Sequence, residues 1–241
     1  HRGISSKELI EKVNKELKDN KLISINEVDK DSQENLGFIN SVRVGILDNG
    51  KRVIIRCHPK GIKNGYFYVE SLVAKKLKEI GLPTYSTYCI HDLEDENDCA
   101  FQVIDKIEGI AVKKWLETHP EDTMKLTYET GKMMKKIHNL KVKGFGSFDN
   151  EKAKLGRLEC LHSSLADFVN CSLKNNLATL VKYKTITQQQ STKILSLFSK
   201  DNPLLNCKQS VLIHNDFVDW NLLTDGNTIT GILDLDECAG G

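Results

Sequence analysis

The chain has 241 residues, 39% apolar and 28% charged, a composition typical of a soluble globular protein with one large domain or two lobes. Its 34 basic and 33 acidic residues leave a formal net charge of +1, which excludes a global field for nucleic acid or an anionic membrane. Seven cysteines without a Cys-x-x-Cys pair argue against a disulfide framework or a cysteine zinc site and favour the reducing cytoplasm. No membrane span, secretory signal or obligatory protein partner is expected.

The first part of the chain is predicted to form a small antiparallel sheet with one internal helix. A first helix is expected over residues 5–20, where apolar side chains recur at helical spacing from Leu9 to Leu17. A second helix is expected over residues 66–80, which Gly81 and Pro83 terminate. Strands are expected, from their β-branched content, at residues 22–28, 41–47, 51–57, 84–90 and 99–107.

The second part of the chain is predicted to be mostly helical. Helical periodicity covers residues 112–116, 124–140, 160–181 and 187–198. Short apolar runs that suit small strands follow at residues 211–214, 221–224 and 228–235. The change of character near Glu108 predicts a hinge, and hence an α+β fold with two lobes, residues 1–107 and 108–241.

The strongest chemical signal is the segment His-Asn-Asp-Phe-Val-Asp-Trp-Asn at 214–221, followed by Gly-Ile-Leu-Asp-Leu-Asp at 231–236. Phosphoryl transfer to a hydroxyl needs a carboxylate that orients and deprotonates the acceptor, and oxygen ligands for the metal on the nucleotide phosphates. Asp216, Asn221 and Asp234 supply these three groups at the spacing of a kinase catalytic loop and its later aspartate. The alternative interpretation is a solvated acidic turn beside a core histidine.

This pattern resembles the aminoglycoside phosphotransferase and choline kinase superfamily, which has a bilobal protein-kinase-like fold. With Gly-Phe-Gly-Ser-Phe at 144–148, it looks most like the hygromycin kinase branch. The resemblance implies that Asp216 is the catalytic aspartate, that His214 braces the catalytic loop, and that Asn221 and Asp234 bind magnesium. Magnesium keeps several waters, so two protein ligands plus phosphates suffice.

The resemblance also implies a nucleotide site in the N-terminal lobe. Gly37, Asn40 and Ser41 resemble the family's phosphate-binding loop, although an ordinary turn would look the same. Arg56 stands where a kinase has its phosphate-binding lysine, and arginine binds phosphate with a bulkier, delocalised group. Glu70 resembles the glutamate that pairs with this cation, the alternative being a solvated helix residue.

Residues 101–109 resemble the hinge between kinase lobes. The backbone from Asp105 to Ile107 would meet the adenine edge of the nucleotide, whereas the alternative is an edge strand. ATP is the expected phosphate donor, but because backbone groups would make these contacts, the residue types do not decide between ATP and GTP.

The acceptor is expected to be a small hydroxyl compound. Asp219, Asp236 and Glu237 belong to an acidic final stretch that could attract a cationic acceptor, with ordinary surface as the alternative. An aminoglycoside antibiotic is the first expectation, which implies a role in resistance. The alternatives are a kinase for choline, a sugar or an amino alcohol, and a catalytically silent nucleotide-binding protein. Relatives continue for several helices after the Asp-x-Asp segment, so the chain is expected to be incomplete or to lack part of the acceptor platform.

Overall fold

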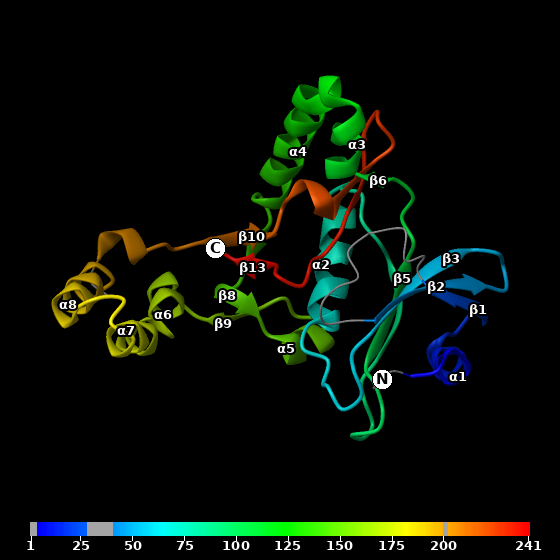
Figure 1. Cartoon of the computed structure of the whole chain (residues 1–241), viewed down its shortest axis with the longest axis horizontal. Coiled ribbons are helices and arrows are strands. Elements are labelled where there is room, and N and C mark those ends of the chain that lie inside the picture. The colour runs from blue at the N-terminus through cyan, green and yellow to red at the C-terminus, as the bar shows by residue number, and fades with distance from the viewer. Residues whose placement is uncertain (1–3, 28–40, 200–201) are drawn as a thin grey trace. The chain divides into compact units, whose positions relative to one another are not determined.

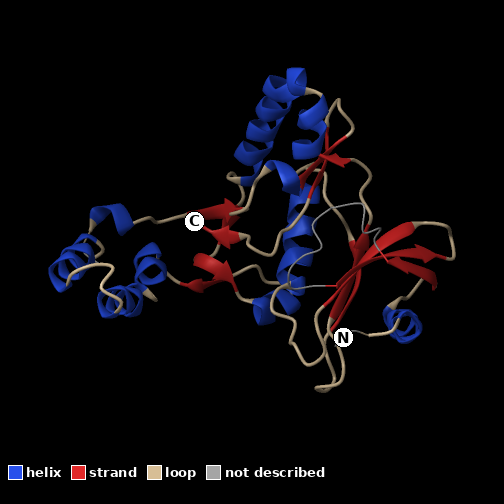
Figure 2. Cartoon of the chain, viewed as in Figure 1, coloured by secondary structure: helices blue, strands red, loops and turns tan. Residues whose placement is uncertain are grey.

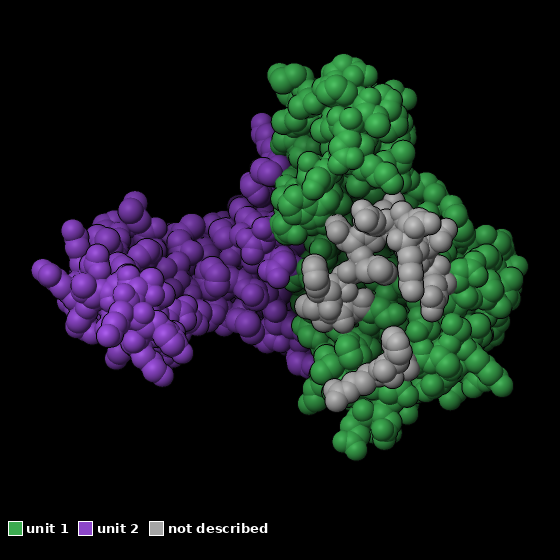
Figure 3. Space-filling model, viewed as in Figure 1, with its two compact units in different colours: residues 1–133, 216–236 green, residues 134–215, 237–241 purple. Residues whose placement is uncertain are grey.

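The chain forms two compact units, shown in Figure 3. In the computed structural model the described residues are 4–27, 41–199 and 202–241. The first unit comprises residues 1–133 and 216–236, and the second comprises residues 134–215 and 237–241. Residues 108–133 and 216–236 therefore group with the N-terminal residues, while the predicted functional division into 1–107 and 108–241 stays a proposal.

The N-terminal residues form a five-stranded antiparallel sheet, as predicted (Figure 2). In spatial order its strands are β1 (Leu22–Glu27), β2 (Ser41–Leu47), β3 (Arg52–Cys57), β5 (Phe101–Asp105) and β4 (Thr87–His91). Side chains alternate between the two faces of a strand. Val53 and Ile55 of β3 are therefore buried on one face, and Arg56 points to the other.

Helix α1 (Ser6–Glu16) covers the face that carries Val53 and Ile55 (Figure 1). Leu9 and Val13 are completely buried in the same apolar cluster as these strand residues. The helix ends four residues before the predicted position, because Leu17 takes an extended conformation.

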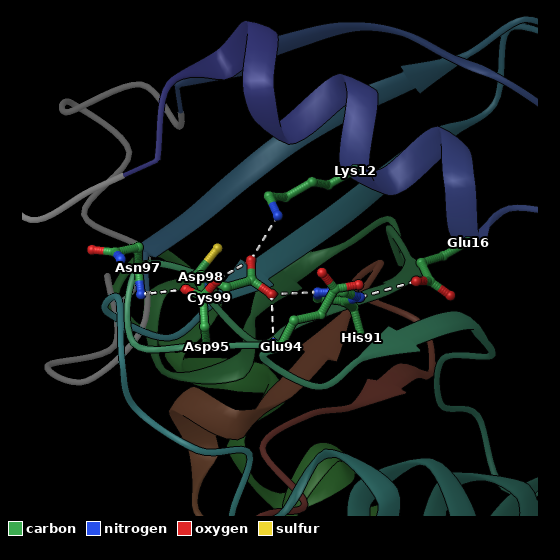
Figure 4. A network of polar contacts seen from close by, with 8 residues as sticks. All are labelled: Lys12, Glu16, His91, Glu94, Asp95, Asn97, Asp98 and Cys99. Carbon is green, nitrogen blue, oxygen red and sulfur yellow. Dashed lines mark hydrogen bonds and ion pairs between the residues drawn. The ribbon is translucent and has the colours of Figure 1, made fainter.

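A cluster of four charged side chains, Lys12, Glu16, His91 and Asp98, fastens α1 to the β4–β5 region, and we call it the α1 clasp (Figure 4). The Asp98 carboxylate is buried, and its oxygens lie 2.8 Å from Lys12 Nζ and 2.8 Å from His91 Nε2. The other ring nitrogen of His91 lies 2.9 Å from Glu16 Oε1. Two backbone amides of its own loop also donate to Asp98, at 2.9 and 2.8 Å. Every oxygen of this buried carboxylate therefore has a partner within the chain.

Helix α2 (Phe67–Glu79) covers the opposite face of the sheet and is the predicted internal helix (Figure 1). Its buried side includes Val73 and Leu77, which provide the apolar contact, and also Glu70, which is 0% exposed. Gly81 ends the helix with φ +72°, a left-handed conformation that glycine adopts without strain. The helix thus brings a carboxylate to the same side of the sheet as Arg56.

A three-stranded antiparallel sheet completes the first unit, in the order β12 (Ile229–Ile232), β11 (Leu222–Thr224) and β6 (Ile110–Ala111). Ile232 N donates to Pro83 O at 2.9 Å, and Thr84 Oγ1 donates to Ile232 O at 2.8 Å. These bonds explain why the strand expected over residues 84–90 begins only at Thr87, since Thr84 bridges to Ile232 instead. They also anchor the β11–β12 hairpin to the segment that follows α2.

The remaining helices before the second unit's strands follow the predicted periodicity closely. They are α3 (Val112–Thr118), the 3-10 helix η1 (Pro120–Asp122) and α4 (Thr123–Ile137). In the described residues no helix has the length and apolar character needed to cross a membrane.

The second unit contains another five-stranded sheet together with short helices. In spatial order its strands are β7 (Lys141–Val142), β10 (Ser210–Ile213), β13 (Ala239–Gly240), β8 (Phe145–Phe148) and β9 (Cys160–His162). Its helices are α5 (Asn150–Lys154), α6 (Leu165–Asn170), α7 (Leu173–Lys182), α8 (Gln188–Leu197) and the 3-10 helix η2 (Pro203–Leu205).

The continuous helix predicted over residues 160–181 is wrong. Cys160 pairs with Phe148 across the β8–β9 ladder, so the first residues are strand. Ser164 then starts a new helix, because its side chain accepts a hydrogen bond from the backbone amide of Asp167. The apolar spacing resembles that of a helix, but the strand pairing and the cap divide the segment.

Candidate active site

Asp216 and Asn221 stand on a loop that ends in the 3-10 helix η3 (Asp219–Asn221). The side chain of buried Asn221 donates through Nδ2 to Asp216 Oδ2 at 2.8 Å and to Asp216 backbone O at 3.0 Å. Because a carbonyl oxygen can only accept, the amide nitrogen faces Asp216 and the amide oxygen faces away. The five-residue spacing thus makes Asn221 the side chain that holds the loop and orients the Asp216 carboxylate.

Asp234 returns to this loop at the end of the β11–β12 hairpin. Leu222 pairs with Ile232 in the hairpin, and Leu233 N donates to Asn221 O at 2.9 Å. Asp234 itself has φ +57°, a left-handed conformation that aspartate tolerates better than most residues. Strained backbone of this kind concentrates at functional sites and persists where surrounding structure enforces it. Here the hairpin bonds enforce it and place the carboxylate beside the Asp216 loop.

In the part of the chain that the structure describes, the carboxylates around Asp234 are only partly balanced by positive charge. Burial raises the pKa of Asp234 to about 6, and the nearby charge of Asp236 adds to this effect, while Arg56 only partly opposes it. The charge of Asp216 raises the pKa of Asp234 further. Such a cluster gains stability when a cation enters it. The site therefore has the electrostatic character of a cation site.

The donor set fits magnesium bound together with phosphates. Among the residues that the structure describes, no three His, Cys, Asp or Glu side chains are arranged to hold a metal ion by themselves. Asn221 and Asp234 offer an amide oxygen and a carboxylate, both hard donors of the kind that magnesium takes. A magnesium ion on these two residues would need further oxygens from phosphate and water.

Arg56 of β3 and Glu70 of α2 form the expected ion pair. Arg56 Nη1 lies 2.6 Å from Glu70 Oε1, and the two side chains are 13% and 0% exposed. Burial raises the pKa of Glu70 to about 7 despite Arg56, and the charges of Asp236 and Asp234 contribute. These mutual effects place Arg56, Glu70, Asp234 and Asp236 in one electrostatic cluster.

Within the predicted hinge segment, Asp105 already makes hydrogen bonds inside the protein. Asp105 N donates to Ser86 O at 2.9 Å, and the Asp105 carboxylate accepts from Tyr88 and pairs with Lys51. These contacts make Asp105 a structural residue of the sheet. The side chain of Ile107 fills the space above Gly231 of the hairpin, where a Cβ would meet it at 2.9 Å. The hinge is thus packed on the hairpin that carries the site.

The remaining predicted site residues of the nucleotide loop and the catalytic loop differ in burial and in position. Ser41 is exposed at the start of β2, directly before the residue that pairs with Arg56. Gly37 and Asn40 lie outside the described residues. His214 is buried and directly follows β10.

Three acidic residues were predicted to attract the acceptor. Asp219 is exposed at the start of η3, next to the loop that carries Asp216. Asp236 is partly buried and belongs to the electrostatic cluster, because its charge raises the pKa of Asp234. Glu237 is exposed and belongs to the second compact unit.

Sequence reasoning missed the residues that hold the site together. Thr84 binds the hairpin at Ile232. The two residues are 148 positions apart, so no local sequence pattern predicts the contact. Trp220 lies inside the recognised motif, but its contact with Lys113 of α3 depends on the fold. The motif could have drawn attention to Trp220, because a large aromatic residue between two functional side chains is unusual on an exposed loop.

Comparison with known protein families agrees with this geometry. The model of the phosphotransferase enzyme family matches residues 35–241. The chain belongs to the phosphotransferase enzyme family. No curated protein matches this chain.

Several solved structures share the fold of this phosphotransferase family member. A thermostable mutant of aminoglycoside phosphotransferase APH(4)-Ia, in a ternary complex with AMP-PNP and hygromycin B, is 19% identical with a TM-score of 0.64, covering 98% of this chain and 72% of that one. The streptomycin–ATP–APH(2")-IIa complex is 14% identical with a TM-score of 0.53, covering 99% and 73%. A putative aminoglycoside phosphotransferase from Ralstonia eutropha is 14% identical with a TM-score of 0.59, covering 97% and 65%.

These similarities confirm the predicted superfamily and the predicted fold class. The N-terminal antiparallel sheet and the helical C-terminal part match the kinase-like fold of aminoglycoside phosphotransferases. At such low identity the solved structures show the fold alone, so the chemistry must be argued from the residues of this phosphotransferase.

Proposed function

We propose that this protein transfers the γ-phosphate of ATP to a hydroxyl of a small cationic acceptor, such as an aminoglycoside. The observation that carries the proposal is the Asp216–Asn221 hydrogen bond beside Asp234, because it supports a proposed base and two proposed oxygen donors lying close together. Residues 1–107 are proposed to bind the nucleotide and residues 108–241 to supply the catalytic loop. The seven free cysteines support a cytoplasmic protein.

Asp216 is proposed as the base that orients and deprotonates the acceptor hydroxyl. Its Oδ2 accepts a hydrogen bond from Asn221, which fixes the carboxylate plane and leaves the second oxygen to accept from a hydroxyl. His214, buried just before the loop, is proposed to brace it. Since phosphoryl transfer asks little covalent work of the protein, this orientation supplies much of the catalysis.

The nucleotide is proposed to bind through its phosphates and its adenine edge. Arg56, held by Glu70, would contact the phosphates, with Gly37, Asn40 and Ser41 as the phosphate loop. Magnesium on Asn221 and Asp234 would neutralise phosphate charge. The hinge backbone from Asp105 to Ile107 would meet the base, with Ile107 the better candidate because the Asp105 amide already donates to Ser86.

The acceptor is proposed to be cationic because carboxylates crowd the transfer site. Asp219 is exposed beside the loop, and Asp236 is part of the electrostatic cluster. With Glu237 they form the proposed acceptor residues. A cationic acceptor would be attracted to these charges. The related structures with bound hygromycin B, gentamicin and streptomycin support an aminoglycoside and hence a role in antibiotic resistance.

The test is a panel of acceptors incubated with magnesium and γ-labelled ATP. It should include hygromycin B, gentamicin, streptomycin, choline and a neutral sugar, with Asp216→Asn as the matched control. Label transfer to an aminoglycoside that disappears in the control is the expected result. Transfer to choline or the sugar alone would establish a metabolic kinase instead. Nucleotide binding without transfer to any member would favour the silent nucleotide-binding alternative and contradict the proposal.

A further inference from the structure

Trp220 occupies a special position on the catalytic loop. It lies directly before Asn221, whose side chain is buried and bound to Asp216. Trp220 as a whole residue is nevertheless 43% exposed. A tryptophan normally buries most of its large apolar surface, because burial is favourable by roughly 25 cal/mol per Å². An exposed indole held beside a rigid pair of site residues therefore presents a binding surface.

Lys113 of helix α3 covers one face of this indole. Its Nζ lies 5.4 Å from the centroid of the Trp220 ring, within the distance of a cation–π interaction. Among the described residues, no carboxylate lies within ion-pair distance of Lys113. Lys51 and Lys132 also lie over aromatic rings, but each of them is bound to a carboxylate as well. Lys182 lies over the ring of its own neighbour in the sequence, Tyr183, whereas Lys113 and Trp220 come from different elements. Within the described residues, the ring of Trp220 is thus the partner of the Lys113 ammonium.

We propose that the Trp220 ring is a cation subsite of the acceptor, and that Lys113 occupies it until a cationic group of the acceptor replaces it. The proposal deepens the proposed function, because it names the residues that select a cationic acceptor. An exposed cation–π contact contributes only about 0.5–1 kcal/mol, so Lys113 is held weakly. A lysine ammonium is also strongly hydrated, which favours its release to solvent.

The subsite selects for charge and not for shape. Trp220 directly follows the exposed residue Asp219 in the sequence and lies four positions after the proposed base Asp216. An uncharged group gains little from the ring quadrupole and does not displace the ammonium of Lys113. Because Lys113 occupies the ring, every acceptor must compete with it and needs a higher concentration to bind. Neutral alcohols are affected most, since they do not displace the ammonium.

The subsite can be tested by fluorine NMR without any phosphoryl transfer. The chain has two tryptophans, so protein labelled with 5-fluorotryptophan gives two resonances, which Trp220→Phe assigns. Trp115 is the internal control, because its ring stacks on His119 at 4.0 Å and its Nε1 donates to Asp122 at 2.9 Å. The probes are choline and 3,3-dimethylbutan-1-ol, an uncharged alcohol of the same shape.

Choline should shift the Trp220 resonance saturably and leave the Trp115 resonance in place, whereas the neutral alcohol should shift neither. Lys113→Gln should strengthen choline binding by about two- to fivefold, the change that corresponds to an exposed cation–π contact. Lys114→Gln, an exposed lysine on the same helix, is the matched control and should leave choline binding unchanged. An equal response to both probes, or equal choline affinity in Lys113→Gln and wild type, would overturn the proposal.

The outcome is separable from that of the proposed function. A Trp220 response to choline in a protein that transfers no phosphate would support the subsite and contradict the phosphotransferase proposal. Transfer to a cationic acceptor with a kcat and KM unchanged in Trp220→Leu would support the phosphotransferase and overturn the subsite. If both proposals are correct, Trp220→Leu should raise the KM for the cationic acceptor about two- to fivefold and leave kcat nearly unchanged.

Discussion

The α1 clasp and the candidate active site both bury carboxylates in the first compact unit, but they shift the carboxyl pKa values in opposite directions. At Asp98 burial alone would raise the pKa, yet hydrogen bonds from Lys12 and His91 outweigh it and hold the pKa well below its usual range. At Asp234 burial and the charge of Asp236 raise the pKa to about 6, and Arg56 does not compensate.

The difference separates a structural cluster from a binding cluster. The Asp98 carboxylate has all its partners within the chain, so folding alone satisfies it. Within the described part of the chain, the carboxylates that act on Asp234 outnumber the cations, so folding leaves an electrostatic cost that a bound cation would remove. Substitutions in the clasp should therefore change stability alone, whereas those in the site should change binding and turnover, and also stability where they break the buried Arg56–Glu70 pair.

The largest expected effect is on turnover, in Asp216→Asn. The substitution keeps size and shape but removes the charge that accepts the proton, so kcat should fall by roughly 10²–10⁴-fold. The measurement is initial-rate transfer of labelled phosphate to the acceptor identified in the panel. Near-normal transfer by folded Asp216→Asn protein would remove Asp216 from the role of base.

Two Arg–Glu pairs of equal length allow a matched test of burial. Arg56 and Glu70 are buried at 2.6 Å, whereas Arg52 and Glu108 lie at 2.6 Å with 52% and 66% of their side chains exposed. Arg56→Ala leaves a buried carboxylate unpaired, so the free energy of unfolding should fall by about 3 kcal/mol. Arg52→Ala should lower it by less than about 1 kcal/mol.

Urea unfolding monitored by circular dichroism measures both changes. Arg56→Lys should recover part of the stability and of the nucleotide affinity, because lysine restores a charge but not the second guanidinium donor. Equal losses in Arg56→Ala and Arg52→Ala would contradict the buried character of the Arg56–Glu70 pair.

In the clasp, Asp98→Ala should lower the free energy of unfolding by about 2 kcal/mol, because it strips acceptors from buried donors. Glu96→Ala in the same loop is the matched control, since Glu96 is exposed and its change should stay within about 0.5 kcal/mol. Mg-ATP affinity should be nearly unchanged in both variants. A loss of nucleotide affinity in Asp98→Ala without a loss of stability would reverse the roles assigned to the two clusters.

The smallest expected effect is the pH dependence of the clasp. Burial lowers the pKa of His91, but hydrogen bonds to Asp98 and Glu16 outweigh it and raise the pKa above its ordinary value. A raised pKa adds stability that is complete below about pH 6.5 and is lost as the pH rises through the folded-state pKa. The buried neighbour Asp98 stays ionised in this range, and Lys12 stays charged, because the pKa of Asp98 is lowered and that of Lys12 raised.

The free energy of unfolding should therefore decrease more steeply above about pH 6.5 in wild type than in His91→Gln, which cannot titrate. Chemical unfolding across this range gives both curves. Parallel curves would show that His91 does not link the clasp to pH.

The sequence predicted those features of the fold and the site that depend on a short, local pattern of residues. The strand at residues 41–47 follows from its β-branched content, the helix around Glu70 from local periodicity, and Asp216 and Asn221 from a short spacing. The break near Ser164 and the Thr84–Ile232 contact depend on strand pairing and tertiary packing, which no window of sequence contains. The left-handed backbone of Asp234 likewise follows from the hairpin and not from its own residue type.

The proposed division of roles between Asp216 and Asp234 is tested by titration calorimetry of Mg-ATP into Asp216→Asn and Asp234→Ala in parallel. We expect Asp216→Asn to bind Mg-ATP nearly as tightly as wild type, because Asp216 is proposed as the base for the acceptor. We expect Asp234→Ala to lose the magnesium-dependent part of the affinity and to stay folded, because Asp234 is a proposed metal ligand and takes no part in the α1 clasp. Equal Mg-ATP affinity in wild type and Asp234→Ala would contradict the account.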